Sequence, residues 1–416
     1  MVFWTGGKVK GIDMDIRKVD ILYFLLVAPF FYPNSIAGTG AASIWHLWKL
    51  AAVVAGAVYI FTRIKILKKL ESVVWFIILM YLMQIVATHM NSIDLTYDIN
   101  TAIMTSVFLL MISLIVYEQG ILGVRFLYNL LDVFVLLNFL SVVLLYGSGI
   151  TKDAYDTPVY FWSTKNHIIS LTLVCIMLAT FLSNENIISE KRARFSIVYS
   201  VIAVFMMGSS TAIVALVVYG LFVFCYKYCI KKGKVLNLKL AMFIGIIVDF
   251  MVVIFRVQEK LGALIGALFG KDTTLTGRTD LWDQAIELIG LNYLYGKGNS
   301  YALGQYGWLT KQYWDSNQQV LEDVYFVSHN QFLEILVNGG MICLIPFILA
   351  FLSMGRSVHK IKNSMYKNVI AAALLAYFIA MITDLVTPYE PLYVFMIVVS
   401  YMYQNENFEE GVSDYE

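Results

Sequence analysis

The stretch that decides the fold runs from Phe195 to Tyr226 and reads FSIVYSVIAVFMMGSSTAIVALVVYGLFVFCY. It is almost entirely apolar and has 32 residues, whereas one membrane-spanning helix needs about 20. The small and polar run Gly208-Ser209-Ser210-Thr211 lies in its middle. We therefore predict two short spanning helices, 195–208 and 211–226, joined by a tight turn.

The composition of the whole chain is that of a membrane protein. Of its 416 residues, 59% are hydrophobic and only 14% are charged. Soluble domains have about 45–50% apolar and about 25% charged residues, so a water-soluble enzyme and a disordered chain are excluded. The net charge of +1 gives no field that would attract nucleic acid. A lipid bilayer is the expected partner.

Apolar runs recur along the whole chain. We predict an all-α polytopic membrane protein with about 12 transmembrane helices and one large ordered extracytoplasmic loop. Residues 1–256 form a transmembrane bundle of helices 1–9, 257–328 a large external loop with amphipathic helices, 329–403 helices 10–12, and 404–416 a cytoplasmic tail. The apolar runs are 19–37, 43–62, 72–88, 98–117, 127–147, 166–183, 195–208, 211–226, 240–256, 329–353, 368–387 and 389–403.

Basic residues predict the orientation of the helices. With twelve spans, most of the 30 lysine and arginine residues fall on one side of the membrane. The positive-inside rule assigns that side to the cytoplasm. An unsplit 195–226 helix would place the lysines of 227–239 outside. We therefore predict a multi-pass plasma-membrane protein with both termini cytoplasmic and the 257–328 loop, with the active site, extracytoplasmic.

The predicted external loop is too aromatic to be a linker. Linkers and disordered segments contain few aromatic residues, whereas this loop includes Trp282, Tyr301 and Trp308. Thr279 is a candidate N-cap, and Trp282 begins a helical spacing of apolar residues. We expect the loop to fold over the outer mouth of the bundle, where the rings of Tyr301 and Trp308 could stack on a ligand. Trp282 is expected to pack as well as to contact substrate.

Charged side chains at the predicted outer face point to anion binding. Arg278 precedes the predicted loop helix and Arg256 ends the ninth apolar run, and guanidinium groups bind phosphate oxygens in two-point contacts. His329 opens the tenth run, where an imidazole can take a proton or pair with a phosphate. Glu334 is an acid inside a predicted span, and such acids are often functional.

Structural interpretations of the same residues stay open. Arg256 can be an interfacial arginine and Arg278 a solvated loop charge, while His329 can bond a helix N-terminus and Glu334 a buried cation or tyrosine. Asp384 and Glu390 flank the outer end of the eleventh run and are expected to orient an arginine. The four cysteines lie in or at the ends of apolar runs, without a CxxC motif or a Cys/His cluster, so we predict no metal site.

Short motifs around the external loop resemble the O-antigen ligase and Wzy-type O-antigen and capsular polysaccharide polymerase family. They are Gly277-Arg278-Thr279-Asp280-Leu281-Trp282, Gly296-Lys297-Gly298, and His329-Asn330-Gln331-Phe332-Leu333 followed by Gly339-Gly340. Twelve spans with one large outer loop between the ninth and tenth also resemble that family. Many members carry an arginine after the serine in the outer turn before the eighth span, whereas this turn reads Ser209-Ser210-Thr211.

The resemblance implies a membrane glycosyltransferase that uses no metal ion or other cofactor. Its substrate would be a polyprenyl-diphosphate-linked oligosaccharide at the outer face of the plasma membrane. A polymerase would transfer the growing glycan onto a new lipid-linked repeat unit, with a flippase and a chain-length regulator as further partners. His329 and Arg278 are the candidate catalytic residues. The candidate substrate-binding residues are Arg256, Asp280, Trp282, Asn330, Glu334, Tyr301 and Trp308.

Two other functions fit the same sequence. An O-antigen-type ligase shares the motifs. We favour the polymerase mostly because polymerases are the larger group in the family, and also because the turn arginine is missing and the chain has no lipid A signature. A lipid-linked oligosaccharide flippase or another secondary transporter also fits twelve spans. Transporters usually consist of two similar halves, however, and the aromatic loop has no counterpart in the first half of this chain.

Overall fold

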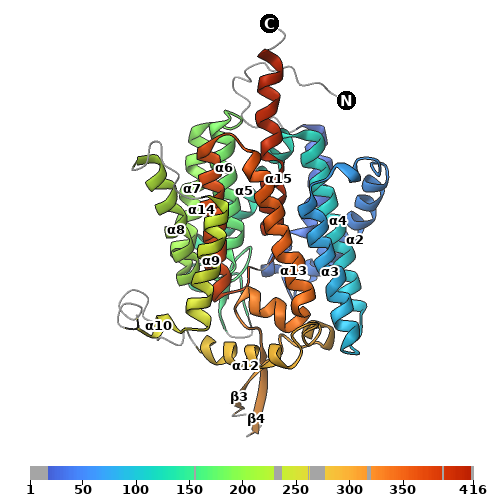
Figure 1. The fold of residues 1–416 in the computed structure, drawn as a ribbon, viewed down its shortest axis with the longest axis vertical. Coiled ribbons are helices and arrows are strands. Elements are labelled where there is room, and N and C mark those ends of the chain that lie inside the picture. The colour runs from blue at the N-terminus through green and yellow to red at the C-terminus, as the bar shows by residue number, and fades with distance from the viewer. Residues whose placement is uncertain are drawn as a thin grey trace.

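A computed structural model describes residues 17–153, 156–228, 237–260, 262, 277–315, 320–386 and 388–413 of the chain. The described residues form a bundle of helices, with a further helix and a β-hairpin beyond one end of it (Figure 1). The helices of the bundle are α1 (Lys18–Val27), α2 (Gly40–Phe61), α3 (Ser72–Met90), α4 (Thr96–Gln119), α5 (Ile121–Leu144), α6 (Ile168–Asn184), α7 (Glu190–Met207), α8 (Ser210–Tyr228), α9 (Leu238–Val253), α13 (Gln331–Lys360), α14 (Ser364–Thr383) and α15 (Glu390–Ser413).

Length and apolar composition make this a multi-pass membrane protein. In the described part of the chain, six helices are long and apolar enough to cross a bilayer, namely α2, α3, α4, α5, α13 and α14, and α6, α8 and α15 are shorter apolar helices. Their outward residues are apolar: on α2, Ile44, Leu47, Val54 and Phe61 are each at least 67% exposed. Such a surface is stable in lipid and not in water. Twelve spans and the orientation stay predictions.

The first apolar run does not form one continuous span. We predicted a full span over 19–37, but α1 has only 10 residues, roughly 15 Å of helix against a hydrocarbon core of about 30 Å. Pro29 is the second residue of a short 3-10 helix, Ala28–Phe30, and Pro33 precedes another, Asn34–Ile36. Proline lacks the N–H that would continue the helix. The break carries Asn34 to the 161–163 segment, where its N–H donates to the carbonyl of Trp162 at 2.9 Å.

The predicted division of the 195–226 run is confirmed. Helix α7 ends at Met207 and α8 begins at Ser210. Gly208 between them has φ +67°, a left-handed conformation that ends a helix and that glycine adopts without strain. Helix α7 also starts earlier than the apolar run does, because Ser189 caps it and accepts a hydrogen bond from the N–H of Arg192.

The segment that we predicted to be external contains more than the predicted helices. The expected helix is present as α12, Arg278–Leu291, and a single turn, α10, spans Val257–Lys260. Strands β3 (Leu309–Asp315) and β4 (Val320–Phe326) then pair antiparallel, with Leu309 opposite Phe326. We did not predict this hairpin, although both stretches contain the β-branched and aromatic residues that favour strands. A second small hairpin, β1 (Thr151–Lys152) with β2 (Pro158–Val159), lies in the 148–165 connection.

Backbone hydrogen bonds fasten the external segment to α13. This helix is kinked at Gly340, where φ is +62°. The N–H of Lys297 donates to the carbonyl of Val337 at 2.7 Å, and the N–H of Met341 donates to the carbonyl of Tyr293 at 2.9 Å. A Cβ on Gly340 would lie 2.3 Å from the carbonyl oxygen of Leu294, so only glycine fits. The Gly339-Gly340 motif thus lets the external segment insert into the kink.

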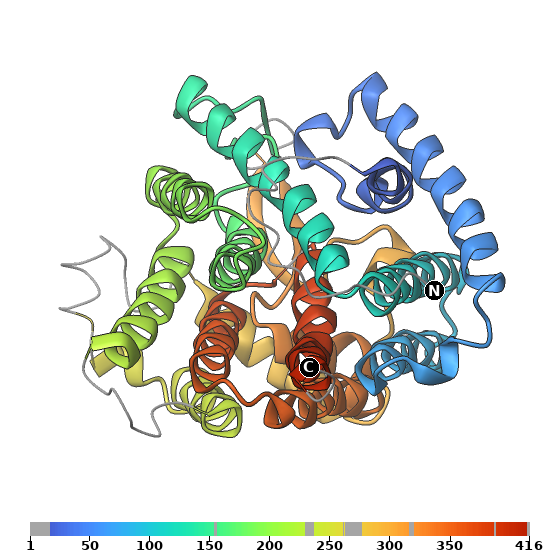
Figure 2. The same ribbon diagram turned by 90° about the horizontal axis from the view of Figure 1, so that it is seen from above.

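Helix α15 occupies the interior of the bundle. It packs against α3, α4, α5, α6 and α13 (Figure 2), and the side chains from Leu392 to Val399 are at most 1% exposed. Its C-terminal end projects from the bundle on the side opposite α12 and the hairpin (Figure 1). If these helices cross a membrane, the C-terminal end of α15 and helix α12 therefore lie on opposite sides of that membrane.

Cysteine labelling tests the predicted orientation. Leu291→Cys, at the exposed end of α12, is expected to react with a membrane-impermeant maleimide added to intact cells. Arg194→Cys, on the exposed first turns of α7, is expected to react only after permeabilisation. The measurement is labelling by gel shift in a background without the native cysteines. The reverse pattern would contradict the orientation and the extracytoplasmic site together.

Candidate active site

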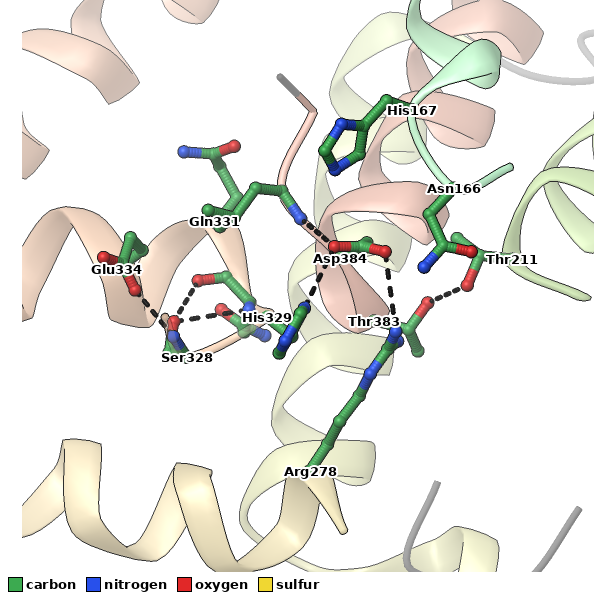
Figure 3. A network of polar contacts seen from close by, with 12 residues as sticks. Asn166, His167, Thr211, Arg278, Ser328, His329, Gln331, Glu334, Thr383 and Asp384 are labelled. Carbon is green, nitrogen blue, oxygen red and sulfur yellow. Dashed lines mark hydrogen bonds and ion pairs between the residues drawn. The ribbon is translucent and has the colours of Figure 1, made fainter. Parts of the chain in front are cut away.

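Three chain segments meet at the buried carboxylate of Asp384 (Figure 3). Asp384 directly follows α14 and is 3% exposed. Arg278, the first residue of α12, places Nη2 3.5 Å from Oδ2, and His329 places Nδ1 3.2 Å from Oδ1. The N–H of Leu385 donates to Oδ1 at 2.9 Å. The two candidate catalytic residues are therefore joined through one carboxylate, and Asp384 orients an arginine as predicted.

Asp384 stays ionised although it is buried. Burial by itself raises the pKa of a carboxyl group. Here the hydrogen bond from His329 and the electrostatic effect of Arg278 outweigh burial, so the pKa of Asp384 lies well below its ordinary value. The ionised carboxylate thus stabilises the fold at and above about pH 4, and this contribution is lost only as the pH falls through the lowered pKa. Asp384 is a fixed negative charge at neutral pH.

The turn before α13 holds His329 in a left-handed conformation with φ +50°. The N–H of Ser328 donates to Glu334 Oε2 at 2.7 Å. Asn330 Oδ1 caps α13 by accepting from two N–H groups of its first turn, while Nδ2 donates to Asp249 Oδ1 at 2.7 Å. The polar atoms of Asn330 and Glu334 are therefore bonded within the protein. Their contacts position His329, although the sequence suggested that both bind substrate.

Two other predicted residues fasten α12 to the bundle. The indole N–H of Trp282 donates to the carbonyl of Ser328 at 3.0 Å, and Trp282 is fully buried. Arg256 Nη2 donates to the carbonyl of Thr279 at 3.2 Å and pairs with Asp283. The Arg256 guanidinium also lies over the Trp282 ring, 5.3 Å from its centroid. The structure thus places Arg256, which we predicted to bind substrate, at the joint between α9 and α12, and its contacts are with Thr279, Asp283 and Trp282.

A cavity of about 310 Å³ opens beside Asp384. Tyr301 forms part of its wall, stacked on Tyr97 of α4 with ring centroids 5.9 Å apart and edge-on to Tyr306 at 6.2 Å. Tyr301 is 41% exposed, so its ring is available to a ligand. The residues that line the cavity are Asn34, His167, Tyr301, Tyr306, Val327, Asp384, Leu385 and Pro388.

Asp280 and Trp308 are not among the residues that line this cavity. Asp280 is an exposed residue in the first turn of α12, where its charge complements the helix dipole. The indole N–H of Trp308 donates to the carbonyl of Gly298 at 2.7 Å, and Lys297 Nζ lies 5.9 Å from the ring centroid. Trp308 therefore braces the Gly296-Lys297-Gly298 segment.

Asn34 and His167 are among the cavity-lining residues that sequence reasoning missed. His167 directly precedes α6, near the start of the 166–183 apolar run, and a histidine at that border was a usable signal. Asn34 lies inside the apolar run that we expected to be a continuous helix, so no pattern in the sequence brought it to the site. Both come from the first half of the chain.

The turn between α7 and α8 reaches the same site without an arginine. Thr211 Oγ1 and Thr383 Oγ1 are 2.8 Å apart, and Ser209 Oγ donates to Asn166 Oδ1 at 3.2 Å. The turn thus contacts the residue before Asp384 and the residue before His167 (Figure 3). In this turn, Ser209 and Thr211 supply hydroxyl groups, whereas many members of the family that the sequence resembles have an arginine there.

Two aromatic substitutions are expected to change different properties, one the amount of folded protein and the other the turnover. Trp282→Ala removes a buried ring and its hydrogen bond, which costs about 3–5 kcal/mol and should lower the amount of folded protein in membranes. Tyr301→Ala is expected to leave the protein level normal and to reduce turnover about 2–10-fold, the loss of one ring contact. Tyr293→Ala, 66% exposed in the same segment, is the matched control. Unchanged turnover by Tyr301→Ala would show that this ring only packs.

Comparison with known proteins agrees with the motifs. Residues 195–348 match a family model described as O-Antigen ligase. A curated relative, "Exopolysaccharide production protein ExoQ" of Rhizobium meliloti (strain 1021), is 36% identical over 118 residues, which is 27% of this chain and 24% of the relative. The alignment thus spans about a quarter of the relative, and no solved structure is a significant match. Residues 195–348, which contain Arg278 and His329, are thus similar to the O-antigen ligase family.

Proposed function

We propose that this protein is a polysaccharide polymerase. It would move a growing glycan from a polyprenyl diphosphate onto a new lipid-linked repeat unit at the outer face of the plasma membrane. One observation carries the proposal. Arg278 and His329 both contact the buried carboxylate of Asp384, which forms part of the wall of a cavity. The family supports glycan assembly in a membrane. The cavity is at the small end of the range for ligand sites, which suits one end of a saccharide.

Arg278 suits the leaving diphosphate. When the glycosidic bond to phosphate breaks, negative charge develops on the leaving oxygen. One nitrogen of the guanidinium contacts Asp384 at 3.5 Å, which fixes its direction and leaves other N–H groups of the fork for phosphate oxygens. A carboxylate behind the arginine also holds it before substrate arrives, so little reorganisation is needed during the reaction.

His329 can serve this reaction in two ways. Its Nδ1 faces Asp384, which orients the ring and leaves Nε2 for another partner. Nε2 can donate to a phosphate oxygen, or it can accept the proton of the acceptor hydroxyl. Both roles require the left-handed turn that Asn330 and Glu334 maintain.

The alternative supported by the comparisons is a ligase, because the matching family model is described by that activity. The two activities differ only in the acceptor. The test is a purified-protein assay with lipid-linked repeat units in lipid nanodiscs, with EDTA present. Polymers longer than the supplied units, without any other acceptor, are expected. If a glycan appeared only after a non-repeat acceptor lipid was added, the polymerase would be ruled out in favour of the ligase. If EDTA abolished turnover reversibly, the metal-free account would be wrong.

A further inference from the structure

One imidazole, that of His167, lines the cavity and has no part in the account above. His167 directly precedes α6, and the cavity wall contains it together with Asp384, whereas His329 is not among the lining residues. Figure 3 shows its ring facing the Asp384 side chain from the opposite side to His329. His167 lies outside the segment 195–348 that matches the family model.

The ring of His167 is held by its inner nitrogen. Nδ1 lies 3.3 Å from Ser163 Oγ, and Ser163 Oγ accepts a further hydrogen bond from Asn34 Nδ2 at 2.8 Å. Within the described ranges of the chain, these are the side-chain contacts that fix the ring, and none of them uses Nε2. In the tautomer with hydrogen on Nδ1, Ser163 accepts from the imidazole and the Nε2 lone pair is available to a molecule in the cavity.

The charges around His167 suit a group that starts neutral and gains a proton. Burial lowers the pKa of His167 below its ordinary value, so the ring is neutral near pH 7. Two titratable groups act on it: the Asp384 carboxylate raises the pKa and His329 lowers it. The buried carboxylate would stabilise the imidazolium once it forms, as the aspartate does in a Ser-His-Asp triad.

We propose that His167 is a further catalytic residue of this site, the general base that activates the acceptor hydroxyl of the incoming repeat unit. The inference rests on the proposed function. The proton of the acceptor O–H moves to His167 Nε2, and the acceptor oxygen forms a bond with the anomeric carbon of the donor glycan. The bond from that carbon to the diphosphate oxygen breaks, and its electron pair leaves with the phosphate beside Arg278.

This assignment separates the roles of the two imidazoles. His167 borders the space that would hold the acceptor, and His329 shares Asp384 with the arginine assigned to the diphosphate. His329 is then left to contact the phosphate. The first half of the chain, through His167 and Asn34, would supply the acceptor side of the site, and the family segment would supply the donor side.

The test compares His167→Ala, His167→Gln and the control His89→Ala, which alters an exposed histidine of α3. Purified proteins in nanodiscs are assayed on lipid-linked repeat units across pH 5–9, with and without added imidazole. Both His167 variants are expected to lose about 10²–10⁴-fold in kcat, as for a general base. Wild-type activity should fall as the pH drops through the lowered pKa, because a protonated ring accepts no proton. This decrease of activity at low pH is the acid limb of the pH profile. The residual activity of the variants should lack the acid limb, and imidazole should restore part of the turnover of His167→Ala.

The outcomes distinguish this inference from the proposed function. If wild type forms no polymer from repeat units, the proposed function fails and the assignment of His167 falls with it. If wild type forms polymer and both His167 variants keep turnover within about twofold, His167 is not the base. Loss of activity with the acid limb intact and no rescue by imidazole would also overturn the inference, because it would indicate a packing role.

Discussion

Arg278→Lys is expected to lose about 10²–10³-fold in kcat, the usual cost of removing a donor that stabilises developing charge. Lysine keeps the positive charge, so the pairing with Asp384 and the folded state should persist. It lacks the planar fork, however, so it cannot present two parallel N–H groups to a phosphate while it contacts Asp384. The measurement is single-turnover glycan transfer by purified protein.

Arg194→Lys is the matched control for this substitution. Arg194 pairs with Glu190 on the exposed start of α7 and is remote in the fold from Asp384. It should keep wild-type turnover, and both variants should give wild-type amounts of protein in membranes. Turnover by Arg278→Lys close to that of wild type would mean that positive charge alone suffices and that two-point phosphate contact is not part of the reaction.

His329→Asn is expected to lose about 10²-fold or more in kcat, whether the imidazole donates to a phosphate or accepts a proton. Asparagine is the informative replacement because it tolerates the left-handed conformation of residue 329 and can still donate to Asp384. His329→Ala should lose at least as much activity and should also be less stable, since alanine is strained at positive φ. The measurements are turnover and thermal unfolding in nanodiscs.

The pH profile of His329→Asn separates the two roles. If His167 is the base, the residual activity of His329→Asn retains the acid limb seen in wild type. If the acid limb disappears with His329 and persists in the His167 variants, the proton goes to His329 instead. Wild-type turnover by His329→Asn would remove this residue from the chemistry and leave Arg278 alone.

Sequence patterns predicted the helices of this protein well, because burial in lipid imposes long apolar runs on them. The same patterns failed where other interactions decide the structure. Two prolines break the 19–37 run into short turns, although its composition alone is that of a span. The hairpin of β3 and β4 depends on pairing between strands, and a search for helical periodicity in the external loop overlooked it.

The candidate site was predictable only in part, for a geometric reason. Arg278 and His329 stand in short motifs, and Asp384 stood out as an acid at a predicted helix end. Which residue meets which depends on how the external segment folds, and this separated Arg256 from the other two. Asn330 and Glu334 lie beside His329 in sequence, yet their polar atoms face the protein. We therefore predicted too many substrate-binding residues, because we judged them by their proximity to His329 in the sequence.

Binding of a polyprenyl diphosphate tests the central claim most directly, because it requires no acceptor and no chemistry. The measurement is equilibrium binding of the radiolabelled lipid to protein in nanodiscs, for wild type, Arg278→Lys, His329→Asn and the control Arg194→Lys. We expect saturable binding by wild type and the control, and affinity at least about tenfold weaker in the two site variants, a difference of about 1.4 kcal/mol each. Equal affinity in all four proteins would contradict the account, because the diphosphate would then bind elsewhere than at Arg278 and His329.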